Sequence, residues 1–294
     1  MQTIKLLKAV LFIGLAALVS CEDKVLLITS TDEASVENEV TADSFFEETD
    51  DLSVLAVASD DATVSGGKTS SGGRRILIAD HRLECAEIEI EIADDSTPQF
   101  PKGTITIDFG DGCEDDRGNV RKGKIIITYA GRRFLPGSVI VTTFESYFIN
   151  DVQIEGMRTV TNTTGSLEEN PKFNIVVVGG KATWPDGTFA TREANRTREW
   201  FRAANPLNDL WQVTGSAAGL DRKGVAYTME ILEPLVYKRE CAVLNRVFMA
   251  VQGIKVLKTD TRVVTIDYGD GECDKLVTIT VDGETREVEI RGNV

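Results

Sequence analysis

The stretch Ala86-Glu87-Ile88-Glu89-Ile90-Glu91-Ile92 alternates strictly between isoleucine and glutamate. Successive side chains of a β-strand point to opposite faces, so this pattern predicts an antiparallel strand with one buried and one solvated face. Strand-like runs continue to Ile290 and are separated by short turns such as Asn150-Asp151 and Asp282-Gly283. The sequence therefore predicts an all-β protein, an antiparallel meander of about 12–15 strands, built as a sandwich or as a long curved or half-barrel sheet.

The boundaries of the later strands are read from the turn residues between them. Gly179-Gly180 is expected to be a turn that separates a strand over Lys172–Val178 from another over Lys181–Trp184. The run Arg246–Leu257 is expected to form one strand. The remaining expected strands are Gly103–Phe109, Gly123–Tyr129, Ser138–Ile149, Val152–Asn162, Thr188–Asn195, Leu210–Ser216, Val225–Ile231, Val263–Tyr268, Leu276–Val281 and Glu284–Ile290.

The composition of the 294-residue chain excludes several classes of function. Hydrophobic residues make up 42% and charged residues 27%, as in ordinary globular proteins. The net charge of −15 repels phosphate backbones, so we expect no nucleic-acid partner. A single histidine, His81, narrows the catalytic repertoire, and we expect it to be a solvated surface residue.

The N-terminus has the features of an export signal. Lys5 and Lys8 precede a ten-residue apolar run, Val10–Val19, which is too short to span a bilayer as a helix. The run leads into Leu18-Val19-Ser20-Cys21, which is similar to a bacterial lipobox. We expect residues 1–20 to be a signal peptide and Cys21 to carry acyl chains, palmitate among them, that anchor the protein in a membrane. The alternative is an ordinary secretory signal.

Residues 21–72 form an acidic leader. Between residues 22 and 72 there are 13 Asp and Glu against two Lys, and such sequence is expected to be a self-repelling flexible tether. Within it, a capping box and the spacing of apolar residues predict a short helix over Ser44–Ser59, with a transient helix as the alternative. Residues 73–294 are expected to form the β domain.

Two segments of that domain resemble each other. Residues 85–130 and 241–291 each run from a cysteine through strands to a Gly-Asp-Gly turn, a second cysteine and another strand. With Cys21 acylated, four cysteines remain in an oxidising compartment. The repeat favours disulfides Cys85–Cys113 and Cys241–Cys273, with four free thiols or one bridge between the two ends as alternatives.

Several motifs together resemble a family of all-β lipoproteins of the Bacteroidota. The resemblance covers nearly the whole β domain and implies a lipoprotein of a Gram-negative envelope, in the outer membrane or on the cell surface. It brings no activity with it, so it assigns no functional residue. The motifs that carry it are the lipobox, Gly72-Gly73-Arg74, residues 107–113, residues 121–129, Phe144–Ile154, Thr197–Trp200 and residues 267–274.

Two groups of side chains are candidates for binding. Aromatic faces beside arginines stack on sugars or peptides, which makes Trp184, Arg198, Trp200 and Trp211 a candidate ligand patch. The alternative is that these residues cover one end of the core. Carboxylates in the two Gly-Asp-Gly turns are weak calcium candidates, and solvated turn residues are the favoured interpretation. These calcium candidates are Asp108, Asp111, Asp267 and Asp270.

The sequence contains no nucleophile elbow, zinc-protease motif or phosphate loop, so we expect no catalytic residue, no enzymatic activity and no cofactor. The leading hypothesis is a non-enzymatic binding or structural module of the cell envelope, with a glycan, a lipid or an envelope protein as its partner. The alternative is a carrier that encloses a lipid or acyl chain in a curved sheet. A more remote alternative is a glycan-acting enzyme that uses a carboxylate pair.

Overall fold

The computed structural model describes residues 28, 29, 32, 36, 52, 53, 56, 57, 74–76, 80–116 and 118–290. The predicted signal peptide and Cys21 lie outside these residues. Four residues of the predicted helix over Ser44–Ser59 are described, and all four, Leu52, Ser53, Ala56 and Val57, are helical. Among the described residues, no helix has both the length and the apolar character needed to cross a membrane.

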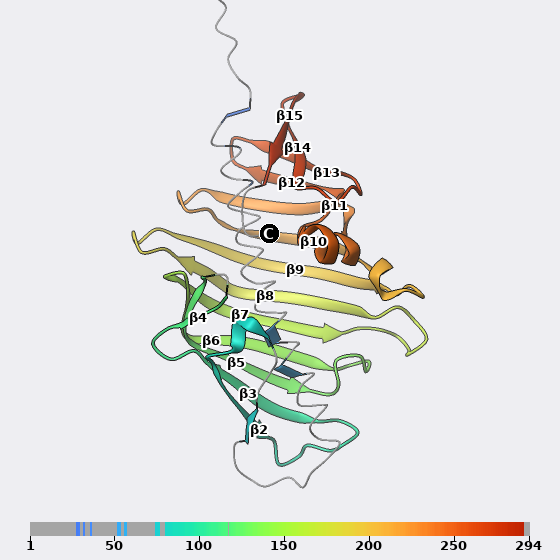
Figure 1. Cartoon of the computed structure of the whole chain (residues 1–294). Coiled ribbons are helices and arrows are strands. Elements are labelled where there is room, and N and C mark those ends of the chain that lie inside the picture. Colours follow the sequence, from blue (N-terminus) through green and yellow to red (C-terminus); the bar gives the residue numbers. More distant parts are fainter. Residues whose placement is uncertain are drawn as a thin grey trace, which may run out of the picture.

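The described chain forms one open antiparallel sheet (Figure 1). Fourteen strands follow one another in a meander, and β4 pairs with β5 beside this path. This confirms the predicted all-β meander and makes it a single long sheet. The strands are β1 Arg74–Ile76, β2 Glu87–Ile92, β3 Lys102–Asp108, β4 Cys113–Glu114, β5 Val120–Ala130, β6 Val139–Ile149, β7 Val152–Asn162, β8 Lys172–Thr183, β9 Phe189–Phe201, β10 Leu210–Leu220, β11 Ala226–Lys238, β12 Gln252–Thr259, β13 Val263–Asp270, β14 Leu276–Val281 and β15 Glu284–Glu289.

Three short helical turns interrupt the meander. η1, His81–Leu83, precedes β2; η2, Pro206–Asn208, lies between β9 and β10; and the π-helical turn η3, Cys241–Asn245, lies between β11 and β12. Because the strands alternate in direction, their connections alternate between two margins of the sheet. The Asp151 margin carries the β6–β7, β8–β9, β10–β11 and β12–β13 turns, and the Asp209 margin carries the β5–β6, β7–β8, β9–β10 and β11–β12 connections.

One face of the sheet is mostly apolar and is buried at both ends of the sheet. Cross-strand pairing brings Ile88, Ile107 and Ile125 side by side, and all three are buried. At the other end, Ile266 pairs with Ile279, and both are fully buried. The intervening outward positions carry mostly Thr, Glu and Lys, as the period-two pattern predicts.

The apolar face is covered in part by the leader, and we call it the leader-facing face. Ile28 and Val36 belong to the buried cluster of the C-terminal half of the sheet, whereas Leu52, Ala56 and Val57 belong to that of the N-terminal half. At these positions the leader packs on the sheet, whereas its charge pattern alone predicts a flexible tether. A 50-residue acidic segment cannot fold alone, but the sheet offers it an apolar surface to pack against.

The leader-facing face also buries cationic side chains. Arg158, Arg192, Arg196 and Lys255 are each at most 4% exposed. A buried cation is costly unless it is paired, so this face differs from a uniformly apolar lipid-binding surface.

Two expected strand boundaries are corrected. Gly179-Gly180 is not a turn: β8 runs through it as one strand, and the pairing with β9 shifts between Val177 and Gly180. The glycines therefore form a bulge, which local sequence does not distinguish from a turn. The expected strand over Arg246–Leu257 begins only at Gln252, because Arg246 ends η3 in the left-handed conformation and residues 247–251 form the connection that leads into β12.

Both expected disulfides are present. Cys85–Cys113 has an S–S distance of 1.97 Å and Cys241–Cys273 one of 2.01 Å. Each joins the start of a hairpin to its end, around β2–β3 and β12–β13 respectively. Eight strands separate β3 from β13 in the sheet, so the two run in opposite directions and their disulfides lie on opposite margins.

Candidate functional site

The structure divides the predicted aromatic patch between the two margins. Trp184 lies in the β8–β9 turn on the Asp151 margin, where the Arg222 guanidinium carbon is 4.2 Å from its ring centre. Trp200 and Trp211 lie at the Asp209 margin. The length of β9 between Phe189 and Trp200 separates the two places by roughly 35 Å. A patch that contains all four predicted residues is therefore not formed.

Trp200 and Trp211 are direct cross-strand neighbours. Their rings stack with centroids 6.1 Å apart and planes 12° apart. Trp200 Nε1 donates a hydrogen bond of 3.1 Å to the buried carboxylate of Asp209, which also accepts one of 2.8 Å from the Ala203 backbone N–H. The ring orientation is thus fixed by the β9–β10 connection.

Phe134, from the β5–β6 connection, extends this cluster. Its ring lies 5.5 Å from Trp200 and 6.2 Å from Phe173, and the Arg133 guanidinium lies over both phenylalanine rings. Arg198 pairs across β8–β9 with Phe173, on the same face of the sheet. The rings therefore contact mainly each other and close the Asp209 margin of the core, while Phe134 remains 47% exposed.

Asp108 and Asp267, two of the calcium candidates, accept hydrogen bonds from backbone N–H groups near the ends of β3 and β13. Asp108 Oδ1 accepts a hydrogen bond from the Gly110 backbone N–H, and Asp267 Oδ1 accepts one from Gly269. The Gly110 bond and then Lys124, 3.1 Å away, lower the pKa of Asp108. Asp267 and Asp270 share an acidic hollow of about 120 Å³, but within the described residues these carboxylate oxygens do not converge on one point as calcium ligands do.

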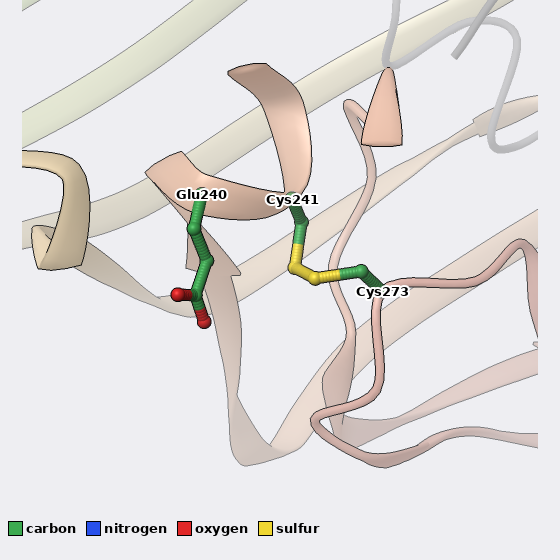
Figure 2. A group of neighbouring side chains, drawn as sticks. All are labelled: Glu240, Cys241 and Cys273. Atoms are coloured by element: carbon green, nitrogen blue, oxygen red, sulfur yellow. A yellow bond between two sulfur atoms is a disulfide. The ribbon is translucent and has the colours of Figure 1, made fainter. Parts of the chain in front are cut away.

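Among the described residues, Glu240, Cys241 and Cys273 place side-chain atoms that could bind a metal within 4.8 Å of one another (Figure 2). Both sulfur atoms are joined in a disulfide, so neither offers the thiolate that a metal requires. His81 lies in η1, where the side chain of Asp80 caps the turn.

A broad concavity lies on the outer face, opposite the leader. A hollow of about 590 Å³ crosses β8–β12. We call it the outer groove. Cross-strand pairing arranges its outward residues in two rows. One row is Glu193, Ala218, Thr228 and Lys258, and the other is Val176, Asn195, Ser216, Glu230 and Val256.

The groove exists because its central strand carries short side chains. Ser216 and Ala218 are the outward residues that β10 contributes to the groove, and they lie between longer side chains on β9 and β11. Gly215 forms a bulge immediately before Ser216, and there the pairing with β11 shifts. A Cβ at Gly215 would lie 2.3 Å from the Asn195 carbonyl oxygen, so only glycine fits this close approach of β9 to β10.

The groove combines hydrogen-bonding groups with small apolar surfaces. Hydroxyls come from Ser216 and Thr228, and a carboxylate from Glu230, all exposed. Asn195 Oδ1 accepts a hydrogen bond from Asn174 Nδ2. The side-chain NH₂ group of Asn195 is therefore the part of this amide that can donate to a ligand. Val178, 47% exposed, adds an apolar wall.

Sequence reasoning missed the outer groove. Its residues come from five strands, and each of them is ordinary when taken one at a time. The only sequence signal is the run Gly215-Ser216-Ala217-Ala218-Gly219, an unusually small-residue segment within a strand.

Comparison of the chain with protein-family models, with curated proteins and with solved structures gave no match.

Proposed function

We propose that this protein is a lipid-anchored, non-enzymatic binding module of a bacterial envelope, and that the outer groove holds a glycan. The observation that carries the proposal is the groove itself, which is about 590 Å³ in volume and within the usual size range of ligand sites. Hydroxyl, amide and carboxylate groups beside small methyl-bearing side chains match a ligand that presents both hydroxyls and C–H surfaces.

The leader-facing face supports this choice over a lipid carrier. A carrier needs an open apolar face, whereas Ile28, Leu52 and Ala56 of the leader are fully buried against the sheet. The cations buried on the same face would add a desolvation cost for an acyl chain. A ligand can enter the outer groove without displacing the leader from the sheet.

The anchor part of the proposal rests on Cys21 and its lipobox. Metabolic labelling with a palmitate analogue in a bacterial host is expected to label the wild-type chain, whereas Cys21→Ser is expected to lose the label and membrane association. An unlabelled wild-type chain would overturn the anchor.

The groove is tested by calorimetric titration with a panel of glucose, mannose and N-acetylglucosamine oligosaccharides. Ala218→Trp places a large ring on the floor of the groove. Thr161→Trp places the same ring on the outer face in β7, beyond the residues that line the groove. We expect an oligosaccharide to bind wild type and Thr161→Trp alike and to bind Ala218→Trp at least about tenfold more weakly. Equal binding to both variants, or no binding of any oligosaccharide to wild type, would overturn the proposal.

A further inference from the structure

The connection between β11 and β12 exposes three large apolar side chains. Val243 is 59%, Leu244 66% and Phe248 54% exposed. Their neighbours Val247 and Met249 are buried in the core. We call residues 241–248 the apolar loop. Its inner side is fixed to the protein, and its outer side exposes Val243, Leu244 and Phe248 within six residues of sequence, with Asn245 and Arg246 exposed between them. Large apolar side chains exposed together in one loop are typical of an interaction site.

The apolar loop has a fixed base. The Cys241–Cys273 disulfide ties its first residue to the end of the β12–β13 hairpin (Figure 2). The Val247 backbone N–H donates a hydrogen bond of 3.1 Å to the Cys241 carbonyl oxygen, which closes the loop. A surface held in this way loses little conformational entropy when it binds.

The described part of the leader shows which end of the sheet lies near the anchor. Ile28 packs in the cluster that contains Ile279, and Asp32 forms an ion pair with Arg262 of the β12–β13 turn. Seven Cα-to-Cα steps lead from Cys21 to Ile28, and a fully extended chain of this length spans about 25 Å at most. Fourteen strands side by side measure roughly 60 Å, so the anchor reaches only the C-terminal part of the sheet.

The buried base of the apolar loop belongs to the same cluster as Ile28, because Cys241 and Val247 are also members of it. The Arg262 turn lies on the other margin, and the eight residues of β12 between the turn and the loop measure about 26 Å. Arg246, within the loop, and Arg239, two residues before it, are exposed, and Glu240 is half-buried. Arg239 also lies 3.8 Å from the Asp209 carboxylate. Apolar side chains flanked by arginines suit the boundary between acyl chains and anionic headgroups.

We propose that Val243, Leu244 and Phe248 insert into the leaflet that holds the acylated Cys21, so that the apolar loop is a second membrane contact. The inference deepens the proposed function, because it rests on the lipid anchor. It also orients the molecule. The β12–β15 end lies close to the membrane, and the β1–β3 end projects away from it.

The test uses the full acylated protein, reconstituted in phosphatidylethanolamine–phosphatidylglycerol vesicles with brominated acyl chains, which quench tryptophan by contact. Phe248→Trp reports on the apolar loop. Phe100→Trp, in the β2–β3 turn at the far end of the sheet, makes the same substitution at another partly exposed phenylalanine. The emission of wild type is subtracted from that of each variant.

We expect the added emission of Phe248→Trp to shift to the blue and to be largely quenched, and that of Phe100→Trp to be unaffected. Hydrogen exchange of wild type provides a measurement without a substitution, and amides 241–248 are expected to exchange more slowly on vesicles than in detergent. Unquenched Phe248→Trp and unchanged exchange, in protein that floats with the vesicles, would overturn this inference and leave the anchor standing. Protein that does not float would overturn the anchor and this inference with it.

Discussion

Asp32 and Arg262 are 230 residues apart in sequence and form a two-point ion pair. Arg262 Nε donates a hydrogen bond of 2.9 Å to Asp32 Oδ1, and Arg262 Nη2 donates one of 2.6 Å to Asp32 Oδ2. The carboxylate also accepts hydrogen bonds from the backbone N–H and the hydroxyl of Thr29. The pair joins the leader to the β12–β13 turn, and the Asp32 side chain is only 3% exposed.

The first prediction concerns the pH dependence of this pair. The hydrogen bonds from Arg262, followed by those from Thr29, lower the pKa of Asp32 from 3.8 to about 2 against the opposing effect of burial. A carboxyl group with a depressed pKa in the folded state stabilises that state above its unfolded pKa. The contribution is lost as the pH falls from about 4 to about 2. We expect Asp32→Asn to lower the free energy of unfolding by about 2 kcal/mol at neutral pH.

Urea unfolding of Asp32→Asn and wild type between pH 2 and pH 7 checks this prediction, and the two curves should converge as the pH falls. Asp282→Asn is the control, because Asp282 is 66% exposed and 3.6 Å from the same guanidinium. It is expected to change stability by less than about 1 kcal/mol. A destabilisation of Asp32→Asn that does not depend on pH would argue against the ion pair.

The second prediction treats the leader as part of the folded core. Leu52 is fully buried in the N-terminal cluster, and the neighbouring Ser53 hydroxyl lies 2.9 Å from that of Thr142 on β6. Leu52→Ala is expected to lower the free energy of unfolding by about 2–5 kcal/mol, through lost apolar burial and the cavity left behind. Leu167→Ala, at a 62% exposed position, is the matched control and is expected to have little effect. Equal stability of the two variants in urea would show that the leader does not contribute to the core.

Much of the fold could be predicted because it follows from local pattern. Alternation such as Glu87-Ile88-Glu89 fixes both the strand and its buried face, and short turns force neighbouring strands to pair. The internal repeat favoured one of the three possible disulfide connectivities, Cys85–Cys113 with Cys241–Cys273, because equivalent cysteines are expected to close equivalent hairpins.

The remaining features depend on register and on contacts between distant residues. The outer groove requires Glu193, Ala218 and Thr228 to be aligned across three strands, which no single strand encodes. Trp184 and Trp200 are 16 residues apart in sequence, yet the hairpin direction puts them on opposite margins. The buried residues of the leader could not be predicted from its acidic sequence. Ile28 and Leu52 are buried because they pack on the sheet, which is formed by residues far away in the chain.

The third prediction concerns the two disulfides. They close segments with sequence separations of 28 and 32 residues. In the chain-entropy account, each one stabilises the folded state by about 3.6 kcal/mol by restricting the unfolded chain. Replacing both cysteines of either pair by serine is expected to cause a loss of that size in urea unfolding, and the two losses should be similar. The intact oxidised protein should contain no iodoacetamide-reactive thiol at these four cysteines, and alkylation of any of them would contradict the pairing.

The fourth prediction isolates the glycine at the base of the outer groove. Gly215 has a φ of 121° and no room for a Cβ, which would lie 2.3 Å from the Asn195 carbonyl oxygen and 2.8 Å from Arg196 Cα. Gly215→Ala must therefore separate β9 from β10, and we expect a loss of about 3 kcal/mol or more. Gly187→Ala is the control, since Gly187 has a φ of 82° in an open turn where an added methyl group would meet no atom within 4 Å.

The control carries only the conformational cost of a left-handed residue, about 1–2 kcal/mol. The difference between the two variants in urea unfolding thus reports the backbone contact together with the less accessible φ of Gly215. Because Ser216 follows Gly215 directly, the same substitution should displace the floor of the outer groove, and native-state hydrogen exchange in β9 and β10 should rise in Gly215→Ala but not in Gly187→Ala. Equal losses of stability in the two variants, with unchanged exchange in β9 and β10, would mean that the bulge accommodates a side chain and that the groove does not depend on glycine.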